Sequence, residues 1–307
     1  MAGHHHDHGA AEAGDRRVFW AIVVNLVLTT AQIIGGLVSG SLSLLADAIH
    51  NLSDAMALVI AFGARRIARR PADRTMTWGY GRAEAVAALI NYTTLIVIGA
   101  YLVYEGVMRL IEPQPVGGWI VVVVAGIALA VDTATALLTY ALSKKSMNIR
   151  AAFLHNVADA LGSIGVIVAG TLIILYDWRI VDPIVTLLIA AYILWQSFVE
   201  IGGSIRLLMM GTPENIDMDA LLAAVRSVEG VENLHHVHLW AVTETTNAFE
   251  AHVVTGGGPD GEILNGIRAV LTERFDVVHA NLQFETADAA CENAPTIGHS
   301  ERRPETS

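Results

Sequence analysis

The sequence predicts an α-helical membrane protein with six transmembrane helices and a C-terminal α+β domain. Hydrophobic residues make up 53% of the chain and charged residues only 16%, whereas soluble domains carry about 25% charged residues. Six apolar segments reach the roughly 20 residues with which a helix crosses a bilayer, and the composition turns polar after Arg206. We therefore expect a transmembrane domain at residues 18–206 and a small soluble domain at residues 212–286.

Residues 1–17 form a polar tail that contains the tract His4-His-His-Asp-His8. Such a tract is a loose metal-capturing arm, the remnant of a purification tag or a solvated tail, and its interruption by Asp7 favours a native tract. The tail lacks the apolar core and the small-residue cleavage pattern of a signal peptide. The first apolar segment should therefore remain in the mature protein.

The expected membrane-spanning helices occupy residues 18–38, 42–64, 83–110, 119–142, 151–176 and 183–205. Lysine and arginine gather at the ends and connections on one side of these helices, while the opposite side carries only Arg109 and Arg179. Positively charged connections stay in the cytoplasm. This asymmetry predicts a multi-pass protein of the cell membrane with both termini in the cytoplasm.

Residues 212–286 predict a cytoplasmic domain with the element order α-β-β-α-β. Apolar residues have helical spacing in 216–228 and 261–275, and they alternate as in strands in 234–242, 248–255 and 276–285. This order predicts a ferredoxin-like α+β sandwich whose helices lie on one face of the sheet. Residues 287–307 are polar and are expected to be disordered.

Two of the expected spans repeat a short polar motif. The matching residues are His50, Asn51, Asp54 and Ala55 in the second span and His155, Asn156, Asp159 and Ala160 in the fifth. Residues four apart share one face of a helix, so each span presents an imidazole beside a carboxylate. A single buried histidine is more often a packing residue. Each ionisable group costs about 2.5–3.5 kcal/mol to insert into a membrane. Two matched pairs of such groups instead predict one shared metal site.

The donor set of this site limits the metal. Two imidazoles and two carboxylates suit tetrahedral Zn²⁺, whereas Mg²⁺ and Ca²⁺ prefer oxygen ligands. Two ionised carboxylates neutralise a divalent ion, and without the ion the same groups should take up protons. Metal and proton therefore compete for the same atoms, which predicts exchange of Zn²⁺ for protons. Transport of Co²⁺, Ni²⁺, Cd²⁺ or Fe²⁺ remains an alternative.

On these residues the chain resembles the cation diffusion facilitator family of divalent-metal/proton antiporters, in its zinc-transporting subgroup. The resemblance covers residues 18–285 and rests on Gly40-Ser-Leu-Ser-Leu-Leu-Ala-Asp47, the two His-x-x-x-Asp motifs, the six spans and the C-terminal domain. It implies a homodimer that exports metal from the cytoplasm by alternating access, with His50, Asp54, His155 and Asp159 as the transport site. A histidine at position 50 implies a preference for zinc.

The sequence departs from the family in the connection between the second and third spans. Some members bind a further metal there through an aspartate and two histidines. Met76 and Tyr80 stand at the histidine positions of this sequence, which leaves Asp73 alone. We therefore expect no metal at Asp73.

The soluble domain is rich in histidine, and its strands should gather these side chains on one polar sheet face. The candidate ligands are His235, His238, His252, His279 and Glu285. The resemblance maps a regulatory metal to His235, His252 and His279, whereas strand alternation groups His238 with His236 and favours it as readily as His235. Such a face either binds zinc and joins two protomers, or is a solvated surface or polar dimer contact.

Further polar residues lie inside the expected spans. Asp47 precedes His50 by three residues and is expected either to orient it or to relay protons, or to form a capping or inter-helix hydrogen bond. The remaining groups are more typical of helix-joining residues; they are Asn25, Gln32, Glu105 and Asp132.

Other protein classes fit less well. The formal net charge of −11 argues against nucleic acid as a partner, and the single cysteine, Cys291, excludes an intramolecular disulfide. An intramembrane zinc metallohydrolase would use three ligands and an open position, and the sequence has no His-Glu-x-x-His helix. A membrane-anchored sensor would not need two matched ligand pairs. We therefore expect a transporter and not an enzyme.

Overall fold

The computed structural model describes residues 8–143, 147–256, 260–291 and 294–298. Within these ranges it does not describe the side chains of residues 8–22, 57–58, 61–62, 138–139, 141–143, 147–152 and 155. The chain forms two compact units. The helical unit comprises Met1–Gly63 and Ala87–Ile201, and the sheet unit comprises Ala64–Val86 and Gly202–Ser307.

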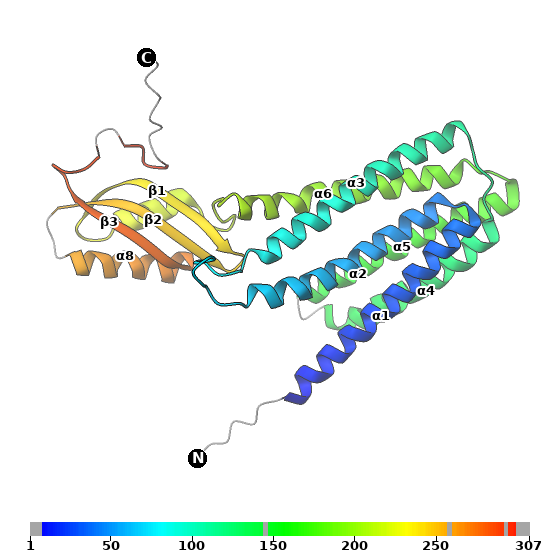
Figure 1. The fold of residues 1–307 in the computed structure, drawn as a ribbon, viewed down its shortest axis with the longest axis horizontal. Helices are drawn as coiled ribbons and strands as arrows, with labels where there is room; N and C mark the ends of the chain where they lie inside the picture. The colour runs from blue at the N-terminus through cyan, green and yellow to red at the C-terminus, as the bar shows by residue number, and fades with distance from the viewer. Residues whose placement is uncertain (1–7, 144–146, 257–259, 292–293, 299–307) are drawn as a thin grey trace. The chain divides into compact units, whose positions relative to one another are not determined.

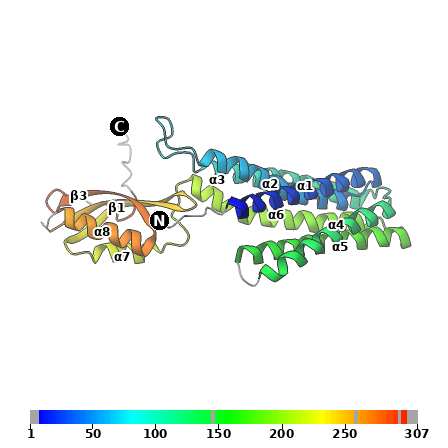
Figure 2. The ribbon, with the colours of Figure 1, turned by 90° about the horizontal axis from the view of Figure 1, so that it is seen from below.

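Six long helices run antiparallel to their neighbours in the chain (Figure 1). They are α1 (His8–Ser39), α2 (Leu42–Ala68), α3 (Ala83–Ile111), α4 (Gly118–Ser143), α5 (Met147–Tyr176) and α6 (Val181–Leu208). Both views show α4 beside α5 (Figures 1 and 2). The predicted helical membrane domain is thus confirmed.

Helix α1 extends into the expected N-terminal tail. It begins at His8, before the expected membrane span that starts at residue 18, and the segment from Ala10 to Ala13 consists of strong helix formers. The tract His4–Asp7 lies outside the described residues.

Among the described residues, four helical segments are long and apolar enough to cross a membrane. They are Ala83–Ile111, Gly118–Leu137, Asn156–Tyr176 and Val181–Leu208. Helix α1 contributes a shorter apolar stretch, Val23–Ser39. In helix α2 the side chains of residues 57–58 and 61–62 lie outside the described ones, and Asp47, His50 and Asp54 stand among its apolar residues.

A buried carboxylate from α6 fixes the start of α2. Asp182 is fully buried and accepts hydrogen bonds from Ser41 Oγ at 2.6 Å, the Leu42 N–H at 2.8 Å and Ser43 Oγ at 2.7 Å. The first N–H groups of a helix lack partners inside the helix, and an acceptor there also meets the positive end of the helix dipole. Sequence reasoning missed Asp182, which sets the position of α2 and of its polar residues.

The sheet unit contains the predicted order of elements. Helix α7 (Met218–Arg226) precedes strands β1 (Val231–Thr243) and β2 (Thr246–Thr255), followed by helix α8 (Asp260–Phe275) and strand β3 (Val277–Thr286). The sheet order is β1-β2-β3, with β1 antiparallel and β3 parallel to β2. Both helices lie on one face of the sheet (Figure 2). The predicted α+β domain is therefore confirmed.

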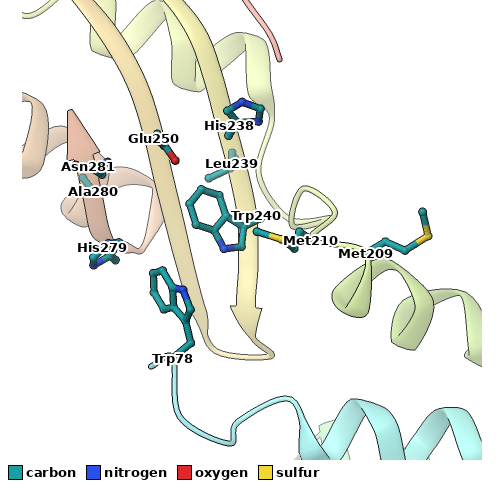
Figure 3. A pocket seen from close by; sticks show the side chains of 10 residues that line it. All are labelled: Trp78, Met209, Met210, His238, Leu239, Trp240, Glu250, His279, Ala280 and Asn281. Carbon is teal, nitrogen blue, oxygen red and sulfur yellow. The ribbon is translucent and has the colours of Figure 1, made fainter. Parts of the chain in front are cut away.

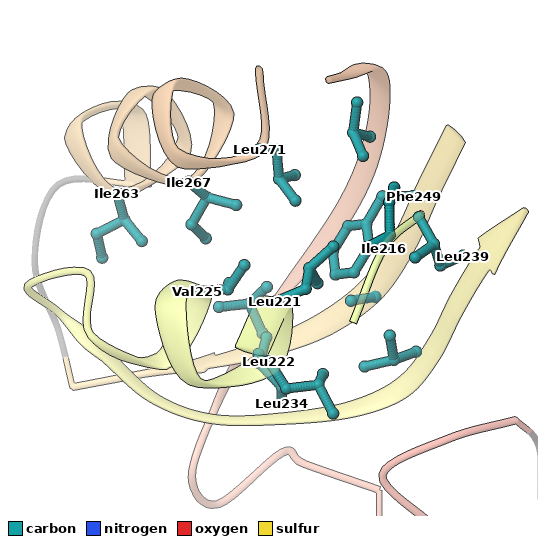
Figure 4. Packing of buried hydrophobic residues seen from close by; sticks show 14 residues of the cluster. Ile216, Leu221, Leu222, Val225, Leu234, Leu239, Phe249, Ile263, Ile267 and Leu271 are labelled. Atoms are coloured by element: carbon teal, nitrogen blue, oxygen red, sulfur yellow. The ribbon is translucent and has the colours of Figure 1, made fainter. Parts of the chain in front are cut away.

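The core of the sheet unit lies between the two helices and the sheet (Figure 4). Leu221 and Val225 of α7 and Ile267 and Leu271 of α8 are fully buried against Phe249 of β2. The opposite face of the sheet is left to polar and aromatic side chains. This division places the histidines of the domain on the face away from the helices.

A bulge in β1 changes the predicted alternation of side chains. His235 pairs with His252 and His238 pairs with Glu250, so three steps on β1 match two on β2. His236 has a φ of 49° within this bulge. The extra residue shifts the alternation by one, which brings both His235 and His238 to the polar face. The regular alternation that was predicted for this strand is therefore wrong, because His235 lies on the polar face together with His236 and His238.

The C-terminal tail also differs from the prediction. Residues 287–307 were expected to be disordered, but the N–H of Val237 in β1 donates a hydrogen bond to Thr296 O, and Ile297 forms a bridge with Val237. The exposed backbone of an edge strand provides this partner. Residues 299–307 lie outside the described residues.

Candidate metal centres

In the helical unit, α2 and α5 bring three of the four predicted ligands together. His50 Nε2 lies 3.2 Å from Asp159 Oδ1 and 3.8 Å from Asp54 Oδ2. One ligand atom from each residue lies within 4.8 Å of the others. The side chain of His155 lies outside the described residues, although its backbone belongs to α5, four residues before Asp159.

The surroundings of this cluster are buried and closely packed. His50 and Asp159 are each only 8% exposed, and the ring of Tyr192 in α6 meets the His50 ring edge-on at 5.8 Å. At Gly162 of α5, a side-chain β-carbon would lie 3.3 Å from Asp47 Oδ1. A small residue there lets α5 approach α2 closely.

This arrangement has a defined chemical consequence. Two carboxylates close to one imidazole in buried surroundings repel each other unless a cation or a proton lies between them. Carboxylate oxygen and imidazole nitrogen are both ligands of Zn²⁺. The cluster formed by His50, Asp54 and Asp159 is therefore fitted to hold a divalent ion or protons in turn.

A second polar layer lies beside this cluster. Gln32 Nε2 of α1 donates to Asp47 Oδ2 at 2.7 Å, and Asn51 Nδ2 donates to Gln32 Oε1 at 3.1 Å. Ser163 Oγ donates to Asp132 Oδ2 at 3.4 Å. Gln32 and Asp132 thus bond neighbouring helices, as expected. Asp47 bonds α1 as well, and its influence on His50 remains a prediction.

The sheet unit holds a second cluster on its polar face, which we call the histidine cluster. Glu285 of β3 lies between two imidazoles, with Oε2 3.1 Å from His235 Nε2 and Oε1 2.7 Å from His252 Nδ1. The rings of His235 and His252 are 5.1 Å apart. The structure thus brings together three of the predicted cytoplasmic ligands.

Electrostatics keep Glu285 ionised. Burial raises the pKa of this carboxyl group. A hydrogen bond from Gln283 and the charges of His252 and His235 lower the pKa by more than burial raises it, so the pKa lies below its usual value. An ionised carboxylate is the form that binds a metal.

Two residues of the histidine cluster were missed by sequence reasoning. Ligand atoms of His235, His236, His252 and Cys291 all lie within 4.8 Å of one another. The bulge turns His236 toward this point, and Cys291 belongs to the tail that was expected to be disordered. The sequence signalled the cysteine only by its being the sole one in the chain.

His238 and His279 lie elsewhere on the same face. They line a pocket of about 700 Å³ with Trp78, Trp240 and Glu250 (Figure 3). The Trp78 ring meets the His279 ring at 4.9 Å and the Trp240 ring at 6.2 Å. Because His279 pairs with Ala248 and not with a residue near His252, one chain does not bring His235, His252 and His279 to a common ion.

In the connection between α2 and α3, the carboxylate of Asp73 accepts hydrogen bonds from neighbouring residues of the same loop. The carboxylate accepts hydrogen bonds from the Thr75 N–H and hydroxyl at 2.7 Å, the Met76 N–H at 2.9 Å and the Tyr80 hydroxyl at 2.8 Å. These bonds lower the pKa of Asp73, the bond from the Thr75 hydroxyl most and the bond from the Tyr80 hydroxyl next. They favour the expectation that no metal binds there, which stays a prediction.

Comparison with known proteins gives a consistent result. The family model for the cation efflux transmembrane domain matches residues 18–209, and the model for the cation efflux protein cytoplasmic domain matches residues 213–287. A zinc transporter ZitB of Pectobacterium atrosepticum is 38% identical over 285 residues, which cover 91% of this chain and 88% of the relative.

Two further relatives cover nearly the whole chain. A metal cation efflux system protein CzcD of Cupriavidus metallidurans is 32% identical over 305 residues, or 99% of this chain and 95% of the relative. A cadmium, cobalt and zinc/H(+)-K(+) antiporter of Bacillus subtilis is 33% identical over 302 residues, or 95% of this chain and 94% of the relative.

Proposed function

Because the chain belongs to the cation efflux family, the cation diffusion facilitators, we propose that it exports Zn²⁺ from the cytoplasm in exchange for protons. The observation that carries this proposal is the convergence of His50, Asp54 and Asp159 from two helices of the helical unit, with His50 and Asp159 buried and Asp54 half-buried. Relatives named as zinc transporter and as cadmium, cobalt and zinc/H(+)-K(+) antiporter support the cargo and the exchange. Since the family consists of transporters, the alternative of a metallohydrolase is set aside.

In the proposed cycle, the ion is bound by His50, Asp54, Asp159 and His155 while the site is open to the cytoplasm. Two ionised carboxylates balance the charge of the ion and remove most of the cost of holding it in buried surroundings. Once the site opens to the other side, protons on histidine and aspartate release the ion. Protonated carboxyl groups no longer repel each other, which stabilises the return.

The proposed preference for zinc rests on the donor set. Imidazole and carboxylate together suit a tetrahedral ion, whereas an all-oxygen set favours Mg²⁺ or Ca²⁺. Co²⁺, Ni²⁺, Cd²⁺ and Fe²⁺ accept the same donors and are the competing cargoes.

We further propose that the sheet unit is a cytoplasmic regulatory domain of a homodimer, with both termini in the cytoplasm of a cell-membrane protein. The cytoplasmic-domain family model over residues 213–287 supports a dimer. Three imidazoles beside the ionised Glu285 support a resident zinc at the histidine cluster. Residues 18–206 and 212–286 are the proposed limits of the two domains, and residues 1–17 of the N-terminal tail.

The test is zinc-driven proton flux in proteoliposomes. Asp159→Asn and His50→Ala should each reduce flux to the level of empty liposomes, because each removes a ligand that also carries the exchanged proton. Asp177→Asn is the matched control, because this exposed carboxylate pairs with Arg179 in the loop before α6 and lies outside the ligand cluster. Normal flux in both ligand variants would contradict the transport site, and flux with another metal but not zinc would contradict the cargo.

A further inference from the structure

Residues 294–298, which we name the tail segment, pair with the edge of β1 that faces away from β2, at the bulge. The His236 N–H donates to Pro295 O at 3.1 Å, and the Val237 N–H donates to Thr296 O at 2.9 Å. The Gly298 N–H donates back to Val237 O at 3.2 Å. The tail segment therefore extends the sheet as a short added strand directly beside the histidine cluster.

This attachment is close in sequence to the cysteine. Cys291 Sγ lies 3.9 Å from His252 Nδ1 and 3.9 Å from Glu285 Oε1. The rings of His235, His236 and His252 lie 4.8 to 5.2 Å from one another. One thiol, one carboxylate and three imidazoles thus face a common space.

The buried members of this group are in contact without forming a hydrogen bond. His235 is only 4% exposed, and its Nε2 lies 3.1 Å from Glu285 Oε2. This contact lacks hydrogen-bond geometry, so among the described residues neither atom has a hydrogen-bond partner. Buried polar atoms without partners are costly, and a cation between them removes that cost.

We propose that Cys291 is a thiolate ligand of this metal site and that the bound ion fastens the tail segment to β1. The inference rests on the proposed cytoplasmic zinc site. To that site it adds a ligand, a metal preference and a tail segment whose attachment depends on the metal. A thiolate beside imidazoles selects soft or borderline ions such as Cd²⁺ and Zn²⁺. The ion joins His235 and His252 of the sheet to the chain just before the tail segment, so metal binding and attachment of the tail stabilise each other.

The single cysteine makes this inference directly measurable. Cd²⁺ is titrated into the full-length protein in detergent, with Asp54→Asn and Asp159→Asn present to disable the transport site. A thiolate-to-cadmium absorption band must come from Cys291, since the chain has one cysteine. We expect the band to saturate at one ion per chain. Cys291→Ser should abolish it and weaken Cd²⁺ binding by at least ~10-fold, because even the loss of a group that only supports a metal ligand costs that much.

A neighbouring variant provides the control. Asp288 accepts a hydrogen bond from Thr286 and is an exposed residue outside the cluster, so Asp288→Asn should keep both the band and the affinity. Zn²⁺ should also slow alkylation of the thiol by a maleimide at least ~10-fold, and a chelator should restore the rate, because a bound thiolate is not available for attack.

Attachment of the tail is measured by hydrogen exchange. In the chain with Cys291, Zn²⁺ should slow amide exchange at His236 and Val237, whose N–H groups bond the tail segment; in Cys291→Ser, Zn²⁺ should leave this exchange unchanged. Equal Cd²⁺ affinity in both chains, without a thiolate band, would overturn the inference and leave the proposed zinc site standing. Absence of binding in the parent chain and in His252→Ala alike would overturn both.

Discussion

The two candidate metal-binding clusters of this molecule differ in their donor atoms and in their surroundings. The cluster of the helical unit combines two carboxylates with an imidazole, and both His50 and Asp159 are 8% exposed. The histidine cluster of the sheet unit combines three imidazoles, one carboxylate and a thiol, and it ranges from the buried His235 to the exposed Cys291.

This difference has a functional meaning. Oxygen-rich sites hold a borderline ion less firmly than nitrogen and sulfur donors do, and protons displace the ion from carboxylate and imidazole alike. The helical cluster is thus suited to taking up and releasing an ion in every cycle. The histidine cluster is suited to retaining one and responding to its cytoplasmic concentration.

The largest expected effect is a loss of stability that is confined to the helical unit and leaves the histidine cluster unchanged. Asp182→Ala should destabilise the helical unit by about 3 kcal/mol or more, because it leaves several buried donors at the start of α2 without an acceptor, each at about 1–3 kcal/mol. Zinc-driven flux should fall with it, while zinc affinity of the histidine cluster should stay unchanged. Thermal unfolding in detergent measures the first effect.

Asp182→Asn provides the control for this prediction, since it keeps one acceptor oxygen and should lose less stability. An unfolding temperature of Asp182→Ala equal to that of the parent protein would show that the carboxylate does not anchor α2.

A medium effect is expected when the histidine cluster alone is disturbed. His252→Ala should weaken zinc binding to this cluster by more than ~10-fold, because it removes the imidazole closest to Glu285. Flux at saturating zinc should persist. Calorimetric titration of a chain with a disabled transport site measures the affinity.

His238→Ala is the matched variant, because His238 is also on the polar face but lines the separate pocket. Its zinc affinity should equal that of the parent chain. An equal loss of zinc affinity in both variants would show that the pocket and the histidine cluster form one site.

The smallest effect concerns Asp73, a carboxylate whose hydrogen bonds all come from residues of its own loop. The pKa of Asp73 is below the usual 3.8, so its hydrogen bonds stabilise the folded loop above that value and are lost as pH falls through the lower pKa. Asp73→Asn should remove this pH dependence and speed amide exchange at Thr75 and Met76. Flux should change less than about twofold; a large loss of zinc affinity would instead reveal a metal site there.

Helical periodicity made the first cluster predictable. Residues four apart share a helix face whatever the neighbouring helices do, so the spacing of His50 and Asp54, and of His155 and Asp159, was sufficient to bring the two pairs into one hypothesis. The spacing of Asp182 carried no such signal, because its partners lie about 140 residues earlier in the chain.

The histidine cluster was only partly predictable, because strand alternation is less robust. One additional residue at the β1 bulge changes which side chains share a face, and no local pattern announces that residue. The approach of Cys291 depends on backbone bonds between the tail and β1, which involve no particular side chains. Sequence patterns therefore predicted His235, His252 and Glu285 but not His236 or Cys291.

The bond network around Asp182 also constrains how α2 can move. Since this carboxylate ties the first turn of α2 to α6, any swing of α2 against α6 must take that end as its pivot. His50 lies eight residues further along α2, about 12 Å from the pivot at the usual rise of a helix. A rotation of about 10° would displace its ring by roughly 2 Å, comparable to a whole zinc–nitrogen bond length. A small angular change at this end of α2 would thus be sufficient to make or break coordination at the proposed transport site.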